Sequence, residues 1–329
     1  MKQNKVSIRK AQIMIKKLKD YFETEFSKEL NLQWVVCPMF VSSESGLNHS
    51  ITGGVDKPVV FEVDDLGFKT AEVILTVAKW KRLALQRYGF NSNEGLYTDM
   101  RAIRPNEKMS KTHSIFVDQW DWELIIPSED RTIAKLQDVV KKIYKVFKST
   151  EEYITSQFPH LQKKLPDEIF FITSEELLKM YPNTTPSERE CKIVEKYKAV
   201  FISNIGRKLS NGEKHGGRSP SFDDWNLNGD IIFWNPVMNS AYEVSSMGIR
   251  VDGKSVLEQL KIANLEGRAK LSYYQDIINE KVPHTIGGGI GQTRTFAFLL
   301  GSKHVGEVQP SVWSDDIFNA CRAEGIELL

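Results

Sequence analysis

Residues 285–294 combine a nearly bare backbone with a single arginine, a pairing suited to binding a phosphate-bearing ligand. Four of the five positions from 287 to 291 are glycine, and Arg294 follows shortly afterwards. Without a Cβ, glycine lets the backbone approach a flat or highly charged ligand closely and permits positive φ. Arginine is suited to planar stacking and to bidentate contact with phosphate. A ligand-binding segment and an ordinary glycine-rich turn fit this pattern about equally well.

The spacing of these glycines excludes two familiar phosphate loops. A dinucleotide-binding turn needs Gly-x-Gly-x-x-Gly between a strand and a helix, with an acidic residue roughly 20 positions later. A Walker A loop needs Lys and then Ser or Thr after its last glycine. Here Gln292 and Thr293 follow Gly291 instead. A nucleotide bound at this segment would therefore be held in another way.

A predicted β-hairpin over residues 230–250 carries a second group of chemically useful side chains. Its second strand contains Glu243, Ser246 and Arg250. Carboxylate and hydroxyl oxygens are the hard ligands that suit Mg²⁺ with a bound phosphate. In a regular strand, positions 243 and 246 face opposite sides, so a shared metal ion would require a β-bulge between them.

The segment 113–125 alternates in a way that predicts a strand with one polar face and one aromatic face. One face carries three polar side chains, Gln119, Asp121 and Glu123, and the other carries Asp118, Trp120 and Trp122. This pattern suggests a sheet with a wet pocket on one side, although a half-exposed strand explains it equally well. Arg104 stands at the entrance of the hairpin that leads into this strand.

Two polar, glycine-containing loops complete the candidate site. Residues 42–57 are long enough to form a flap and contain His49, although a lone loop histidine is usually just exposed. Residues 211–228 contain Arg218 and Asp223, which are able to bind a substrate or a metal ion. A surface salt bridge is the commoner explanation for such a pair.

The remaining pattern predicts an α+β fold, a mostly antiparallel sheet flanked by helices, as a single domain over residues 1–329. Helical spacing of apolar residues predicts helices over the following segments: 4–32, from Thr70 onward, 132–158 and 256–280. The second of these helices carries the cations Lys79, Lys81 and Arg82, which are either ligands or snorkelling surface residues. A buried strand is expected over 35–41.

Bulk composition narrows the class of protein. The chain has 329 residues, 41% of them hydrophobic, so it can bury a large core. Its 44 Lys and Arg residues balance 43 Asp and Glu residues, which gives no general case for nucleic-acid or membrane binding. Three widely spaced cysteines form neither a metal motif nor a disulfide framework, as expected of a cytoplasmic protein. No signal peptide or membrane span is expected.

The order of these motifs resembles a known family. Arg104 in a strand-loop-strand unit, Glu-x-x-Ser-x-x-x-Arg at 243–250 and Gly-Gly-Gly-Ile-Gly-Gln-x-Arg at 287–294 resemble the catalytic domain of class II aminoacyl-tRNA synthetases of the aspartate, asparagine and lysine group. Longer blocks are similar to ammonia-dependent asparagine synthetases, the aspartate–ammonia ligases; these blocks are residues 78–82, 94–98, 117–123, 227–230, 245–250 and 285–294.

This resemblance implies a reaction and its participants. The family is a class II synthetase-like homodimer that uses ATP and Mg²⁺ to convert aspartate into β-aspartyl adenylate and pyrophosphate. Ammonia then attacks the acyl carbon, and asparagine and AMP are released. No anticodon-binding domain is visible in the sequence, so no tRNA partner is expected.

The resemblance also implies roles for individual residues. For the nucleotide, it implies that Arg104 binds the α-phosphate, that Arg294 binds adenine or the γ-phosphate, and that Arg218 binds the polyphosphate. The backbone at Gly288, Gly289 and Gly291 would approach the nucleotide closely. Metal binding falls on Glu243 and Ser246. Aspartate contacts fall on Lys81 and Arg250 for the α-carboxylate, and on Thr76, Gln119, Asp121 and Asp223 for orientation.

One position departs from the family pattern. His49 stands where the family usually has an aspartate close to the reacting amide end, a candidate for accepting a proton from ammonium. Histidine can also act as a base near neutral pH, but it lacks the fixed negative charge. We therefore keep two alternatives open: an adenylate-forming relative with another acceptor, and a catalytically impaired nucleotide-binding paralogue.

Overall fold

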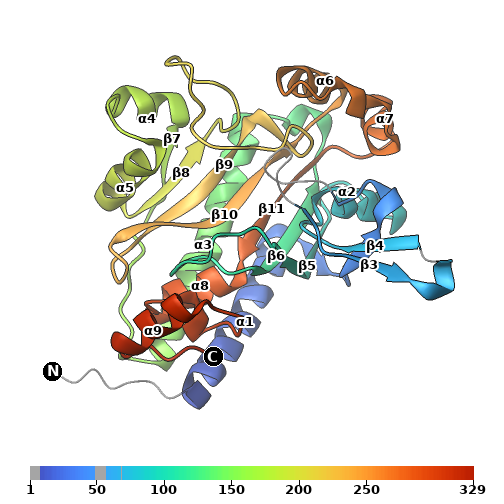
Figure 1. Cartoon of the computed structure of the whole chain (residues 1–329). Helices are drawn as coiled ribbons and strands as arrows, with labels where there is room; N and C mark the ends of the chain where they lie inside the picture. The colour runs from blue at the N-terminus through green and yellow to red at the C-terminus, as the bar shows by residue number, and fades with distance from the viewer. Residues whose placement is uncertain (1–7, 49–56, 68) are drawn as a thin grey trace.

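The computed structural model describes residues 8–48, 57–67 and 69–329, so residues 49–56 of the predicted flap, His49 among them, lie outside the described residues. A large sheet crosses the molecule in the order β1-β5-β6-β11-β10-β9-β8-β7 (Figure 1). Its strands are β1 (Leu32–Trp34), β5 (Gly95–Ile103), β6 (Phe116–Ile125), β7 (Phe170–Thr173), β8 (Ala199–Ser203), β9 (Asp223–Asn235), β10 (Ser240–Arg250) and β11 (Thr285–Gly291). Only its two end pairs, β1 with β5 and β7 with β8, are parallel. The predicted α+β class with a mostly antiparallel sheet is confirmed.

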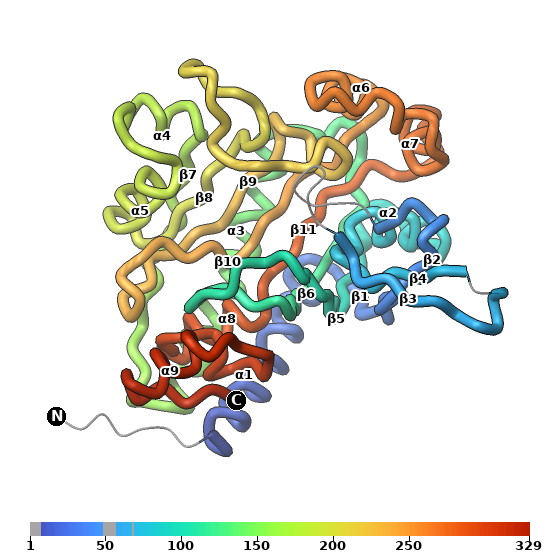
Figure 2. Tube along the Cα trace, viewed as in Figure 1, coloured from blue at the N-terminus to red at the C-terminus, as the bar shows by residue number. Residues whose placement is uncertain are grey.

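Helices flank this sheet, and a smaller sheet lies beside it. The helices are α1 (Ile8–Leu30), α2 (Ala78–Arg87), α3 (Ile133–Gln157), α4 (Ser174–Met180), α5 (Pro186–Tyr197), α6 (Gly253–Ile262), α7 (Ser272–Ile278), α8 (Gln292–Leu300) and α9 (Asp315–Ala323). The small sheet has the order β2-β4-β3, formed by β2 (Phe40–Ser42), β4 (Lys69–Val73) and β3 (Val60–Val63). Figure 2 shows the α6–α7 segment near α2, and Lys79 of α2 does contact α7. Among the described residues, no helix combines the length and apolar character needed to cross a membrane.

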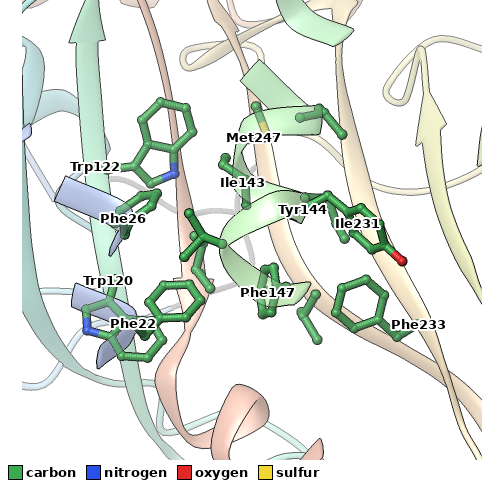
Figure 3. Packing of buried hydrophobic residues seen from close by; sticks show 14 of the residues in the cluster. Phe22, Phe26, Trp120, Trp122, Ile143, Tyr144, Phe147, Ile231, Phe233 and Met247 are labelled. Carbon is green, nitrogen blue, oxygen red and sulfur yellow. The ribbon is translucent and has the colours of Figure 1, made fainter. Parts of the chain in front are cut away.

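Aromatic side chains fix the long helices to one face of the sheet. Trp120 and Trp122 of β6 are fully buried against Phe22 and Phe26 of α1 (Figure 3). The rings of Phe22 and Trp120 stack with centroids 4.2 Å apart. Because such side chains bury the largest apolar areas, they supply much of the energy that holds α1 in place. The opposite face of β6, which carries Asp121 and Glu123, is therefore left for polar chemistry.

Two predicted helices differ from the structure. Residues 69–73, expected to begin a helix at Thr70, form strand β4, because both neighbouring strands β2 and β3 pair with it. Helix α2 begins only at Ala78. The single helix expected over 256–280 is broken between α6 and α7, where Asn264 adopts a left-handed φ of 56°. Helical periodicity continues across both interruptions, so sequence pattern did not reveal them.

Three further segments differ between the sequence prediction and the structure. The predicted loop 211–228 ends at Phe222, because Asp223 is already paired with Arg250 in the β9–β10 ladder. The strand expected over 35–41 is mostly absent, because residues 35–39 lie in no strand and only residues 40 and 41 belong to β2. The glycine-rich segment is neither a loop nor a turn but strand β11, which is hydrogen-bonded to β6 and β10 on its two sides.

Candidate active site

A cavity of about 210 Å³ lies on the face of the sheet away from α1, where β6, β10, β11 and the first turn of α8 meet. It brings together residues that are far apart in sequence, since Arg104 and Arg294, which are 190 positions apart, line the same space. Other predicted site residues also line it, namely Gln119, Glu243, Ser246, Gly289 and Gly291. The two distant arginines thus open into one cavity, as a shared triphosphate requires.

Arg294 is held in a defined orientation by β10 and by the loop before β6. Its Nη1 donates to the carbonyl oxygen of Glu243 at 2.7 Å, and its Nη2 donates to Nε2 of His113 at 2.7 Å. The guanidinium also lies 5.9 Å from the ring centroid of Tyr242. These contacts leave the planar group pre-oriented beside the cavity, which lowers the entropy cost of binding an anion or an adenine ring.

A β-bulge places the predicted metal ligands on one face. The pairing of β10 with β9 shifts register between Glu243 and Ser245. Val244 and Met247 both enter the core beneath the sheet, so Glu243 and Ser246 both line the cavity. The bulge that the sequence analysis required is therefore present.

Asp230 is a site residue that the sequence analysis missed. It lies opposite Ser246 in the β9–β10 ladder, and Arg218 donates a hydrogen bond to its carboxylate. Burial and the nearby Glu243 raise the pKa of Asp230 to about 6, although Arg218 opposes them. Sequence alone did not place it there, because an unbulged hairpin puts residue 230 across from residue 245, and only the bulge brings Asp230 opposite Ser246.

The donor atoms here fit a magnesium ion that binds chiefly through phosphate. Asp230, Glu243 and Ser246 offer hard oxygens, and burial together with the charge of Glu243 raises the pKa of Asp230. The described residues contain no group of three or more His, Cys, Asp or Glu side chains placed to hold a metal ion. Mg²⁺ commonly takes one or two carboxylates and completes its shell with water and substrate phosphates.

Beside the cavity, five buried charged groups form one ion-pair network. Lys81 contacts Asp121 and lies 3.6 Å from Glu123 Oε2. Arg250 donates to Glu123 through Nε at 2.9 Å and Nη2 at 2.8 Å, and it also pairs with Asp223. All five side chains are at most 8% exposed. Burial opposes ionisation of Glu123, but Arg250 and Lys81 outweigh it and lower the pKa of this carboxyl.

This network shows that the two predicted carboxylate-binding cations are already paired with protein groups. Lys81 and Arg250 supply two positive charges, whereas Asp121, Glu123 and Asp223 supply three negative charges. An amino-acid zwitterion is suited to such a site, because its carboxylate can replace an internal carboxylate while its ammonium compensates the displaced group. A bound amino acid would therefore exchange with internal carboxylates for Lys81 and Arg250, because neither cation is free of an ion pair.

Some predicted site residues do not line the cavity. Gly288 faces away from it, since a Cβ there would lie 2.6 Å from Met247 Cβ, although its carbonyl oxygen accepts from Lys81 Nζ at 3.0 Å. Thr76 accepts a hydrogen bond from the Ala78 amide at 3.2 Å at the start of α2. Arg218 donates a hydrogen bond to Asp230, and its charge also acts on Asp223 and Glu243.

His113 was also missed, and its contact with Arg294 predicts an acid limb in the activity. Because Arg294 donates to Nε2, His113 must be neutral, with Nδ1 facing the hydroxyls of Ser110 at 3.0 Å and Thr112 at 2.9 Å. Burial, and then the charge of Arg294, lower the pKa of His113 below its ordinary 6.5. Protonation removes the acceptor and repels the guanidinium, so we expect kcat/KM for ATP to fall as pH drops through this lowered pKa.

A pH profile of His113→Gln tests this expectation. Glutamine keeps an oxygen acceptor that does not titrate, so the acid limb is expected to flatten in the variant. An unchanged acid limb would mean that another group controls it.

Gly289 predicts a steric effect on the amino-acid side of the site. A Cβ at this position would lie 2.5 Å from Gln119 Oε1 and 3.1 Å from Asp121 Oδ2. The Gln119 side chain must therefore move in Gly289→Ala, and we expect KM for aspartate to rise about tenfold or more. Gly217→Ala is the matched control, because nothing lies within 4 Å of a Cβ there. Steady-state kinetics that show equal effects of both changes would contradict the expectation.

Comparison with known proteins places this geometry in a family. The model of the aspartate–ammonia ligase family matches residues 9–325. The chain is 53% identical over 324 residues to the aspartate–ammonia ligase of Ruminiclostridium cellulolyticum, covering 98% of this chain and 96% of that protein. It is 50% identical over 324 residues to the aspartate–ammonia ligase of Clostridium tetani, covering 98% and 95%.

Solved structures agree on the fold. The structure of an asparaginyl-tRNA synthetase from Pyrococcus horikoshii complexed with asparaginyl-adenylate aligns with a TM-score of 0.66 at 12% identity, covering 91% of this chain and 68% of that one. An aspartyl-tRNA synthetase from Entamoeba histolytica aligns with a TM-score of 0.61 at 14% identity, covering 94% and 63%. The fold is thus that of class II synthetases, and with the family match over nearly its full length, the chain belongs to the aspartate–ammonia ligase family of enzymes.

Proposed function

We propose that this enzyme synthesises asparagine from aspartate and ammonia by way of a β-aspartyl adenylate, at the expense of ATP. The observation that carries the proposal is the placement of Arg104 and Arg294 on one cavity, next to a buried network suited to an amino-acid zwitterion. A bare carboxylate is a poor acyl donor, because the leaving group would be oxide. Transfer of AMP to the β-carboxylate supplies a good leaving group.

In the first step, a β-carboxylate oxygen forms a bond to the α-phosphorus while the bond from that phosphorus to the bridging oxygen breaks. Pyrophosphate departs with the electron pair of that bond. Arg104 is assigned to the α-phosphate and Arg294 to the adenine or γ-phosphate, with Gly289 and Gly291 giving close backbone approach. The contribution of these residues is charge stabilisation and in-line positioning of the reacting groups.

Aspartate is assigned to the buried network with its side chain directed toward the nucleotide. Lys81 and Arg250 hold the α-carboxylate, while Asp121 and Asp223 accept hydrogen bonds from the α-ammonium. Gln119 and Thr76 complete this orientation. The exchange of internal for substrate partners is supported by the pairing of both cations with protein carboxylates. With the α-groups held this way, the β-carboxylate is the only carboxylate left to react.

A magnesium ion is assigned to Glu243 and Ser246, with Asp230 as a further ligand. When bound, it supplies positive charge that neutralises the phosphate oxygens. The bulge that turns both β10 ligands into the cavity supports this assignment.

In the second step, the ammonia nitrogen attacks the acyl carbon, the bond from that carbon to the AMP oxygen breaks, and a proton leaves the nitrogen. We assign His49 as the candidate group that accepts this proton. The assignment is supported by its place in the sequence alone, since it lies outside the described residues.

The decisive experiment measures pyrophosphate release with aspartate, with and without ammonium, together with direct detection of asparagine. We expect aspartate-dependent pyrophosphate release and ammonium-dependent asparagine. Pyrophosphate release without asparagine would favour an adenylate-forming relative with another acceptor. ATP binding without turnover would favour an impaired nucleotide-binding paralogue.

We further propose a homodimer of single-domain subunits that acts in the cytoplasm without a tRNA partner. Support for the dimer comes from large apolar side chains exposed near strand β1, which is at the edge of the main sheet; these are Trp34, Val36, Met39 and Phe40. A contiguous exposed apolar patch commonly marks an interface. Sedimentation measurements of the wild type and of Val36→Lys test this proposal, and a monomeric wild type would refute it. The three free cysteines are consistent with a reducing compartment.

A further inference from the structure

Arg189 of α5 is a buried cation without a partner in the described part of the chain. The residue is 1% exposed, and neither its Nε nor its Nη1 finds a hydrogen-bond acceptor among the described residues. No carboxylate of those residues forms an ion pair with it. Burying a charge without compensation is costly, so a buried unpaired guanidinium calls for a partner that the chain does not supply. An anionic ligand is such a partner.

The packing of α5, the helix that carries Arg189, shows which face of the sheet this helix covers. Ile193, one turn further along α5, packs against Val200, Ile202 and Ile232. The alternate strand residues, such as Ile231, belong instead to the core formed with α1 and α3. Side chains of a strand alternate between faces, so α5 covers the face opposite those two helices. That is also the face that carries the cavity and the ion-pair network.

The connection from α5 to β8 indicates which residue of β9 lies beside Arg189. The carbonyl oxygen of Lys198 accepts from the amide of Trp234 at 2.8 Å, which fixes the end of α5 beside β9. α5 belongs to the crossover between the parallel strands β7 and β8, so it runs back against β8. Arg189 lies nine residues earlier, a helical distance of about 14 Å, which equals roughly four strand residues. Counting four residues from Trp234 along β9 leads to Asp230.

A second contact joins the same turn of α5 to the loop that carries Arg218. Nε2 of His215 lies 3.0 Å from Oε1 of Glu190, the residue next to Arg189. His215 is 5% exposed, and its Nδ1 also has no hydrogen-bond partner among the described residues. The first turn of α5, His215 and the Arg218–Asp230 pair therefore gather at one end of the strands, close to Glu243 and Ser246.

We propose that Arg189 binds the β- and γ-phosphates of the nucleotide, and the pyrophosphate product, at the end of the site marked by Arg218 and Asp230. This assignment rests on the proposed adenylation reaction and adds a binding residue to it. The guanidinium supplies the donors, and the phosphate oxygens supply the negative charge that the chain lacks at this point. Among the buried residues of α5, which are Arg189, Ile193 and Val194, Arg189 alone is charged.

Arg189→Met separates a ligand-binding role from a structural one, because the two roles predict opposite changes in stability. Methionine fills similar volume without the uncompensated charge, so the melting temperature without nucleotide is expected to stay the same or rise. At the same time, KM for pyrophosphate in aspartate-dependent ATP–pyrophosphate exchange is expected to rise about tenfold or more, the loss typical of a charge-assisted hydrogen bond. KM for aspartate is expected to change less than twofold.

Two matched variants complete the experiment. Lys192→Met removes a charge from the exposed side of the same helix and is expected to change neither quantity. Arg189→Lys retains the charge and is expected to recover part of the pyrophosphate affinity. A lower melting temperature for Arg189→Met with an unchanged KM for pyrophosphate would overturn the proposal and assign Arg189 a structural role.

Failure of the proposed reaction is distinguishable from failure of this inference. Calorimetry with magnesium pyrophosphate measures binding to the wild type and to Arg189→Met without any turnover. Weaker binding to the variant supports the inference even if no exchange occurs with aspartate. Equal binding to both proteins, or no binding to the wild type, refutes it.

Discussion

Replacing Arg294 with alanine is expected to lower the rate of aspartate-dependent pyrophosphate release by about 10²–10³-fold, the usual cost of losing one pre-oriented charge-stabilising group. The guanidinium is held by Glu243 O and His113 Nε2 at the edge of the cavity, so its orientation is set before ligand arrives. The loss is expected in kcat as well as in KM for ATP, because negative charge moves onto the departing pyrophosphate in the transition state. Single-turnover release of pyrophosphate measures the chemical step directly.

The control for this change is Arg322→Ala in α9. Arg322 is an exposed arginine away from the cavity lining, so its removal is expected to leave the rate within about twofold. The melting temperature of Arg294→Ala should stay close to that of the wild type, since Arg294 forms no ion pair with a described carboxylate. A rate for Arg294→Ala within tenfold of the wild type would remove the residue from the nucleotide site.

Replacing Glu123 with alanine is expected to destabilise the fold by about 3–5 kcal/mol, the usual cost of breaking a buried ion pair. Glu123 is fully buried and accepts hydrogen bonds from Arg250 and, at 2.6 Å, from Thr285 Oγ1. Its removal leaves Arg250 and Lys81 buried with less negative charge around them. The free energy of unfolding in urea measures this effect, and KM for aspartate is expected to rise because both cations lose their fixed positions.

The exposed pair of Arg207 and Glu258 offers a matched control. Glu258→Ala removes a surface carboxylate and is expected to change stability by less than about 1 kcal/mol. Equal destabilisation by Glu123→Ala and Glu258→Ala would contradict the network.

The same carboxylate also predicts the pH dependence of stability. Because the pKa of Glu123 in the folded state is lowered below 4.5, its stabilising contribution is fully present above pH 4.5. The contribution is lost as pH falls through the lowered pKa. The wild type should therefore lose stability toward acid pH more steeply than Glu123→Gln.

The ion-pair network changes how the amino-acid site is understood. From sequence, Lys81 and Arg250 were predicted to hold a substrate carboxylate, which implies free cations. In the structure, both are bound to internal carboxylates, so the cost of burying them is met before substrate arrives. Specificity can then arise from exchange, because a ligand must offer both a carboxylate and an ammonium to replace the internal pairs without leaving a buried charge unpaired.

The sequence by itself determined the parts of this protein that depend on local spacing. Alternation in residues 116–125 predicted which side chains of β6 share a face, since a strand repeats every two residues. The motif blocks ending at Arg250 and Arg294 were sufficient to indicate the family, and the spacing of Glu243 and Ser246 required a bulge that the structure contains. Helix α1 followed from the helical spacing of its apolar residues, from Ile8 to Leu30.

Only the tertiary structure decided features that depend on partners distant in sequence. Residues 69–73 form a strand because β2 and β3 pair with them, and Asp223 leaves its loop because Arg250 lies opposite. His113, Asp230 and Arg189 carry no local signature, because their roles arise from a contact with Arg294, a position across from Ser246, and the absence of a described partner. Local spacing restricts which residues share an element, whereas burial and pairing across the sheet decide which charges meet.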